Sequence, residues 1–441
     1  VAMNPEVDFV LKTIKSRDVH FVRLWFTDVL GRMKSFAVSP SEIEHAFADG
    51  MGFDGSCVAG FSPAEESDML AFPDPSTFQV LPWRPSEDAV ARMFCDVRTP
   101  DGAAFEGDPR QVLRRVVDAA AEKGYAFNVG PELEYYYFKT PEEPEVLDRG
   151  GYFDLTGLDY ASDLRRDTVL ALEKMGIPIE YSHHENGPSQ HEIDLRYTDA
   201  LSMADAVMTY KLVVKEIARV HGVFASFMPK PLADAPGSGM HVHQSLVDLD
   251  GNNLFFDEGD PLGYNLSVTA KRYLAGILKY APEFCLVTNQ YVNSYKRLIG
   301  EGEVPACLSW AHTNRSALLR VPGYRPHQPE ACRIELRSPD PSANPYLAFA
   351  VMLAAGLAGI EEELDPGDPV EGALGCDEQT GLAKLPANLG EAVELFAASD
   401  LMRKTLGEHI HSYLVETKRA EWMEYLRHVS QWELERYLAV L

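Results

Sequence analysis

Two pairs of acidic residues are the first sign of chemistry in this sequence. Glu132 and Glu134 lie two positions apart in the apolar, aromatic run 129–138, which is typical of a strand. Side chains at i and i+2 of a strand face the same side, so these carboxylates would repel each other unless a cation lay between them. Glu185 and Glu192 flank a Gly-Pro-Ser turn that would aim both carboxylates at one point. A single Glu-x-Glu pair is more often a solvated strand face, so the interpretation depends on further residues.

Two more segments supply histidine, glutamate and arginine. Residues 237–245 read Gly-Ser-Gly-Met-His-Val-His-Gln-Ser. The glycines allow the backbone to approach a ligand, and His241 and His243 share one strand face. Residues 333–337 read Arg-Ile-Glu-Leu-Arg and present three long charged side chains on one face. The candidate metal ligands are Glu132, Glu134, Glu185, Glu192, His241 and Glu335. Oxygen-rich ligation with one imidazole favours Mg²⁺ or Mn²⁺ over a structural zinc ion.

Arginines gather in one stretch of a chain that has few positive charges. Lys and Arg total 40 against 67 Asp and Glu, yet five arginines fall within about forty residues. They are Arg297, Arg315, Arg320, Arg333 and Arg337. Metal ions with arginines are typical of phosphoryl transfer, where positioning and charge neutralisation dominate. The sequence has neither G-x-x-x-x-G-K-[ST] nor G-x-G-x-x-G, so we expect no P-loop and no Rossmann turn.

Charge and composition exclude other classes of protein. A net charge of −27 repels a phosphate backbone, so nucleic acid is not an expected partner, although much of the acid could simply be solvated surface. The longest apolar stretch, 345–360, is too short to cross a bilayer and is expected to form a buried helix. The six cysteines include no C-x-x-C pair and the first residues do not resemble a signal peptide. We therefore expect neither a disulfide framework nor a membrane anchor, and a cytoplasmic location.

The chain divides into two expected domains. Residues 1–107 read as a small α+β unit, with a helix at 7–16, a hairpin over 21–38 and strands at 78–83 and 91–97. The expected boundary is Asp108 with Pro109, an N-cap and a first-turn proline for a helix that Gly124 ends. Residues 108–441 alternate strands with helices. The strands are expected at 126–129, 133–138 and 192–195, the helices at 161–175, 202–220, 266–281, 346–363, 390–397 and 399–415, and an irregular surface segment at 364–389.

Seven segments together resemble the signature series of type I glutamine synthetases. They are residues 53–56, 130–134, 183–185, 237–243, 293–298, 314–316 and 333–341. They occur in the order of that family and span nearly the whole chain. The resemblance implies an α+β fold with an N-terminal β-grasp domain and a larger α/β catalytic domain. It also implies a dodecamer of two hexameric rings with active sites between neighbouring subunits.

The resemblance further implies a role for individual residues. Glu134, Glu185 and Glu192 would hold one metal ion and Glu132, His241 and Glu335 a second, with two or three Mg²⁺ or Mn²⁺ ions per site. The substrate-binding residues would be Tyr152, Gly237, Arg297, Arg320 and Arg337. The residues at the ATP would be Glu180, His243, Ser245, Arg315 and Arg333. The catalytic residues would be Asp54 from the adjacent subunit, Glu303 in a flap, Arg315 and Arg337.

The activity implied is ATP-dependent ligation of ammonia to the γ-carboxylate of glutamate through γ-glutamyl phosphate. Four residues depart from the family pattern: Cys57, Pro236, Glu330 and Cys332. They leave open a paralogue that joins glutamate to a larger amine, such as a polyamine or ethanolamine. A non-catalytic homologue is a third interpretation, which retention of all six ligands argues against. An adenylylation tyrosine has no match near 375–390, and Pro63 stands where short-form relatives have a feedback-sensing arginine.

Overall fold

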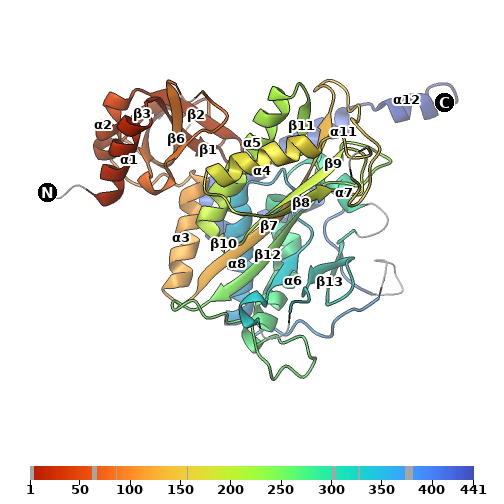
Figure 1. Ribbon diagram of the computed structural model, residues 1–441. Helices are drawn as coiled ribbons and strands as arrows, with labels where there is room; N and C mark the ends of the chain where they lie inside the picture. The colour runs from red at the N-terminus through yellow and green to blue at the C-terminus, as the bar shows by residue number, and fades with distance from the viewer. Residues whose placement is uncertain are drawn as a thin grey trace.

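The computed structural model describes residues 4–61, 67–85, 87–155, 157–299, 304–325, 328–372 and 381–441. Within these residues the chain forms two sheets, a smaller N-terminal one and a larger one that runs through the middle of the molecule (Figure 1). The N-terminal strands lie at one side of the larger sheet, and the C-terminal helix extends away at the other (Figure 1). Pro63 and Glu303 lie outside the described residues.

The smaller sheet has the order β2-β1-β6-β4-β3, with β5 paired to β6. Its strands are β1 (Val19–Thr27), β2 (Met33–Val38), β3 (Met51–Asp54), β4 (Asp68–Pro73), β5 (Gln79–Val80) and β6 (Ala89–Arg98), with helices α1 (Pro5–Ser16) and α2 (Ile43–Asp49). The expected hairpin is confirmed, because β1 pairs antiparallel with β2. Val22 and Leu24 of β1 join Val10 of α1 in the core of this domain. Alternate apolar residues of β1 therefore bury one face of the sheet against α1.

The larger sheet has the order β13-β14-β15-β12-β7-β9-β8, and β10 and β11 also pair with β7. Its strands are β7 (Ala126–Phe138), β8 (Ile179–His184), β9 (Gln190–Leu195), β10 (Thr198–Asp199), β11 (Phe224–Ser226), β12 (Met240–Val247), β13 (Cys307–Ala311), β14 (Ala317–Arg320) and β15 (Ile334–Leu336). The helices are α3 (Pro109–Ala121), α4 (Ser162–Lys174), α5 (Ala200–Val220), α6 (Val268–Thr288), α7 (Val292–Leu298), α8 (Pro345–Glu361), α9 (Leu389–Ala397), α10 (Asp400–Leu406), α11 (Glu408–Arg427) and α12 (Gln431–Tyr437).

The apolar stretch near 350 is the buried helix α8, as expected. It packs closely against α6, where a Cβ at Gly276 would lie 2.2 Å from the Ala355 carbonyl oxygen. No described helix is long and apolar enough to cross a membrane. The close approach of the two helices explains why a glycine stands at this point of α6.

Three local expectations need correction. The expected helix 399–415 is two helices, because Gly407 has a φ of 83° and separates α10 from α11. The expected strands 126–129 and 133–138 are one continuous strand, β7, despite the Gly-Pro pair within it. Cys307 is disulfide-bonded, whereas Cys57, Cys95, Cys285 and Cys332 are free thiols. The sequence spacing of the cysteines gave no signal for that bond.

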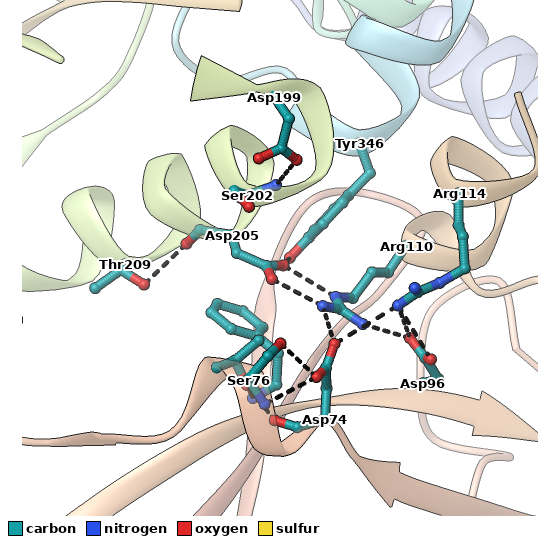
Figure 2. Close-up of polar contacts among 12 residues, drawn as sticks. Asp74, Ser76, Asp96, Arg110, Arg114, Asp199, Ser202, Asp205, Thr209 and Tyr346 are labelled. Atoms are coloured by element: carbon teal, nitrogen blue, oxygen red, sulfur yellow. Dashed lines mark hydrogen bonds and ion pairs between the residues drawn. The ribbon is translucent and has the colours of Figure 1, made fainter. Parts of the chain in front are cut away.

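The two sheets are joined through a buried arginine at the start of α3 (Figure 2). Arg110 makes two hydrogen bonds to Asp205 of α5, at 3.1 and 2.9 Å. It also donates to Asp74, which follows β4, at 2.8 Å and to Asp96 of β6 at 2.5 Å. Tyr346 of α8 donates to Asp205 at 2.6 Å. One guanidinium thus neutralises carboxylates from both sides of the contact between the domains.

Replacing Arg110 by alanine is expected to destabilise the protein by about 3–5 kcal/mol, because buried carboxylates would lose their cation. The matched control is Arg114→Ala, since Arg114 also pairs with Asp96 but its side chain is 35% exposed. We expect this second change to cost about 1 kcal/mol or less. Urea unfolding of both variants beside the wild type measures the difference. Equal losses in the two variants would contradict the assignment of Arg110 as the central cation.

Candidate active site

Register in the larger sheet places charged side chains opposite one another. On β7, Glu132 pairs with His241 of β12 on one side and with Asp194 of β9 on the other. Glu134 of the same strand pairs with Glu192 of β9. Directly opposed side chains in a sheet have Cβ atoms about 5 Å apart. The two acids of β7 therefore lie beside two further acids on β9 and beside a histidine on β12.

The same register continues on the far side of β12. Glu335 of β15 lies opposite His243 of β12 and opposite Arg320 of β14. Arg320 Nη1 donates to Glu335 Oε2 at 3.1 Å, and Arg337 donates to Oε1. Although burial opposes it, the charge of Arg337 lowers the pKa of Glu335. This carboxylate is therefore held in its ionised form.

These strands line a cavity of about 1020 Å³. All six expected metal ligands line it, together with Tyr152, Gly237, His243, Arg297, Arg315, Arg320, Arg333 and Arg337. Asp54, Glu180 and Ser245 are not among the described residues that line the cavity. Glu303 lies outside the described residues, although the two residues after it, Val304 and Pro305, line the cavity. The structure thus brings together most of the residues that the sequence singled out.

One group of acids gathers where β8 and β9 turn. Glu185 and Glu192 have ligand atoms within 4.8 Å of each other and of His183, whose Nε2 lies 3.0 Å from Glu185 Oε1. Burial and the Glu185 charge raise the pKa of Glu134 to about 8. Burial and the neighbouring Asp194 raise the pKa of Glu192 well above its usual range. Such crowding favours protonation unless a cation relieves it, so this donor set fits a divalent ion.

A second group forms between β7, β12 and β15. His243 Nε2 lies 2.7 Å from Glu132 Oε1, and His241 Nδ1 lies 3.4 Å from Glu132 Oε2 and 3.8 Å from Glu335 Oε1. Arg333 Nε donates to His243 Nδ1 at 3.2 Å, so the proton of neutral His243 is on Nε2 and points at Glu132. Glu132, His243 and Glu335 have ligand atoms within 4.8 Å of one another, so the structure places His243 closer to Glu132 than the expected ligand His241. Carboxylate and imidazole donors again fit Mg²⁺ or Mn²⁺.

The loop before β12, residues 236–239 and here called the glycine loop, lies against Arg297. A Cβ at Gly237 would lie 2.7 Å from Arg297 Cγ, and one at Gly239 would lie 2.6 Å from its Nη2. The guanidinium is held by backbone oxygens, with Nη1 2.7 Å from Ser338 O and Nη2 3.0 Å from Arg337 O. The glycines are required for the close approach of this arginine rather than for their backbone angles.

The segment after α8, expected to be irregular, helps to position Arg315. Glu371 accepts hydrogen bonds from the amides of His312 and Thr313, at 2.6 and 2.9 Å. Although burial opposes it, these bonds and the Thr313 hydroxyl lower the pKa of Glu371 to about 2. The turn that carries Arg315 into the cavity is therefore held by a carboxylate that sequence reasoning did not identify.

Sequence reasoning also missed cavity residues on β8 and β9. His183 belongs to the 183–185 segment but is not among the expected ligands, and Gln190 belongs to none of the motif segments. Gln190, Glu192 and Asp194 alternate along β9 and so share one face. That i, i+2, i+4 spacing was the available signal for Gln190.

Comparison with known proteins decides the family. The model for "Glutamine synthetase, catalytic domain" matches residues 106–437, and that for "Glutamine synthetase, beta-Grasp domain" matches residues 18–100. The chain belongs to the glutamine synthetase family. A glutamine synthetase of Mycolicibacterium smegmatis is 51% identical over 99% of this chain and 100% of its own length. One of Methanosarcina mazei is 50% identical over 98% of this chain and 97% of its own length.

Solved structures of this family give the same result. The structure titled "GmaS/ADP complex-Conformation 1" aligns with a TM-score of 0.89 at 32% identity, over 98% of this chain and 99% of its own. "Apo GmaS without ligand" aligns with a TM-score of 0.87 at 33% identity, over 97% and 99%. The family inferred from the sequence, its ligase class, and its β-grasp plus larger catalytic domain are confirmed.

Proposed function

We propose that this cavity joins ammonia to the γ-carboxylate of glutamate at the expense of ATP. The observation that carries the proposal is one cavity lined by six candidate metal ligands and five arginines. Relatives about 50% identical over nearly their full length bear the name glutamine synthetase. The family is ATP-dependent and divalent-metal-dependent in general. These relatives do not favour the larger-amine alternative, and the intact ligand set argues against a non-catalytic homologue.

Two metal sites follow from the donor sets. Glu134, Glu185 and Glu192, with His183 beside them, would hold one ion. Glu132, His241 and Glu335 would hold a second, and two or three Mg²⁺ or Mn²⁺ ions per site are expected. Ions bound there would supply charge neutralisation for the phosphates of ATP.

Arginines and the glycine loop position the reactants. Arg297 and Gly237 bind glutamate, with Arg320 nearby. Three arginines neutralise the phosphoryl group as it passes from ATP to the γ-carboxylate: Arg315, Arg333 and Arg337. The carboxylate is a poor electrophile, whereas the γ-glutamyl phosphate formed from it has a good leaving group. His243, which lines the cavity, would contact the nucleotide, whereas Glu180 and Ser245 lie outside the cavity lining and stay predictions from the resemblance. The relative titled as an ADP complex supports a nucleotide site in this fold.

The ammonia site is shared between subunits. Tyr152 lines the cavity with its ring 5.3 Å from that of His183. Asp54 is exposed in the single chain, so a neighbouring subunit would supply it to attract ammonium and accept its proton. Glu303 would close a flap that excludes water from the acyl phosphate. This arrangement fits the proposed dodecamer of two hexameric rings, built from subunits with domains 1–107 and 108–441.

The test is ATP turnover with glutamate fixed and the amine varied. Ammonium, ethanolamine, putrescine and spermine are compared by ADP release and by identification of the product. We expect kcat/KM for ammonium to exceed that for each larger amine at least about tenfold. A preference of that size for any other amine would replace the proposal with a γ-glutamyl-amine ligase.

The C-terminal segment provides a prediction about assembly. Helix α12 extends from the body of the molecule (Figure 1), and the side chains of Trp432, Leu438 and Val440 are 57%, 76% and 74% exposed. Apolar side chains exposed in this way favour an interface between subunits. Deleting residues after 428 is expected to convert the dodecamer into hexamers or smaller species, as measured by sedimentation velocity. The control is Arg436→Ala, which keeps the apolar side chains. A truncated protein that remains dodecameric would contradict the prediction.

A further inference from the structure

A buried amide connects two parts of the cavity that bind different ligands in the proposed function. Gln190 is completely buried at the start of β9. Its Nε2 lies 2.9 Å from Glu134 Oε2 and 3.1 Å from the carbonyl oxygen of Gly237. Its Oε1 accepts a hydrogen bond from the Gly187 amide at 2.9 Å. One side chain thus contacts a proposed metal ligand, the glycine loop and the turn between β8 and β9.

The glycine loop also binds Glu134 directly. The amide of Gly239 donates to Glu134 Oε2 at 3.0 Å, and the amide of Glu134 donates to the carbonyl oxygen of Gly239 at 3.1 Å. Glu134 Oε1 instead faces His241, at 4.0 Å from its Nε2. One carboxylate oxygen is therefore directed at the loop and the other at the second proposed metal site. Any ligand that fixes this carboxylate also restricts the loop.

A second side chain holds the glycine loop without a hydrogen bond to Glu134. Tyr136 of β7 donates to the carbonyl oxygen of Pro236 at 2.7 Å. A Cβ at Gly187 would lie 2.1 Å from the Tyr136 hydroxyl and 2.8 Å from Gln190 Oε1. The absence of a side chain at Gly187 therefore leaves room for both Tyr136 and Gln190. Substitution of Tyr136 is a suitable control for substitution of Gln190, because Tyr136 bonds to the glycine loop and Gln190 bonds to both the loop and Glu134.

We propose that Gln190 is a positioning residue that couples divalent-ion binding at Glu134 to glutamate binding at the glycine loop. The proposal rests on the proposed function, which assigns these two ligands to the two places. Because binding coupling is reciprocal, bound glutamate tightens ion binding by the same factor by which the ion tightens glutamate binding. A buried amide with only a packing role would affect stability and would leave this factor unchanged.

The experiment measures Mn²⁺ binding by electron paramagnetic resonance, with and without saturating L-glutamate and without ATP or ammonia. In the wild type, glutamate is expected to lower the Kd of Mn²⁺ about fivefold or more. In Gln190→Met the ratio of the two Kd values should fall clearly below that of the wild type, and the part that remains is carried by the direct bonds between Gly239 and Glu134. In Tyr136→Phe glutamate should bind more weakly while the ratio stays near that of the wild type, because Gln190 still donates to Glu134.

A second variant protects the test against misfolding. Gln190→Glu keeps the shape and the acceptor for the Gly187 amide, but places an oxygen where Nε2 donated to Glu134. It should lower the ratio of the two Kd values in the same way. A wild-type ratio preserved in both Gln190 variants overturns the proposal, as does a ratio near one in the wild type. If the wild type makes no glutamine yet shows a coupling that the Gln190 variants weaken, the proposed function fails and the coupling stands.

Discussion

Replacing Glu132 by glutamine is expected to lower ATP-dependent ligation about 100-fold or more at saturating Mg²⁺ while leaving the fold intact. Glu132 lies opposite His241 and Asp194, and both of its carboxylate oxygens face histidines of β12. The amide has nearly the same shape but lacks the negative charge that the second proposed ion requires. The same change should weaken Mn²⁺ binding, which is measurable without turnover.

The control for this change is a carboxylate far from the cavity. Glu145 is exposed and pairs with Lys139 at the surface, so Glu145→Gln should leave turnover and Mn²⁺ binding unchanged. Circular dichroism and thermal unfolding of both variants establish that the fold is retained. Undiminished turnover in Glu132→Gln would contradict the metal assignment, whichever amine proves to be the substrate.

Asp54→Ala is expected to raise the KM for ammonium strongly and to lower kcat, with little change in the binding of ATP or glutamate. A carboxylate beside a bound ammonium stabilises the cation, and its removal would leave the ammonium without that partner. In the single chain Asp54 is exposed and accepts a hydrogen bond from the Ser56 amide at 2.8 Å. A larger amine would bring apolar contacts of its own and depend on Asp54 less.

Mixed oligomers test whether Asp54 acts in the site of a neighbouring subunit. Asp54→Ala and Glu132→Gln chains, each nearly inactive alone, are co-expressed and purified together. If one subunit supplies Asp54 to the next, random mixing restores about a quarter of the sites. If both residues served the same chain's site, no mixed assembly would contain an intact site. Mixed oligomers that show no gain in activity would therefore contradict the shared site.

The sequence alone determined the features that depend on residues close together in the chain. The Glu-x-Glu and His-x-His spacings of β7 and β12 put each pair on one face because strand side chains alternate. Asp108 and Pro109 predict the start of α3. In the structure Asp108 caps this helix, because its carboxylate accepts a hydrogen bond from the Arg110 amide at 2.9 Å. The series of short motifs was enough to indicate the family. Gly407 is also a possible helix end, but the helical pattern continues on both sides of it. The pattern therefore did not predict that the positive φ of Gly407 separates two helices.

Only the tertiary structure decided which distant residues meet. Strand register sets Glu134 opposite Glu192 and His243 opposite Glu335, and register depends on the packing of the whole sheet rather than on local spacing. For the same reason Gln190 became visible as a partner of Glu134 only in the folded chain. Asp54 lies outside the cavity lining of its own chain, so its proposed place in a site depends on contacts between subunits as well as on the fold of one chain. Side chains from elements far apart in the chain come into contact only when folding packs those elements together, so local spacing does not specify such contacts.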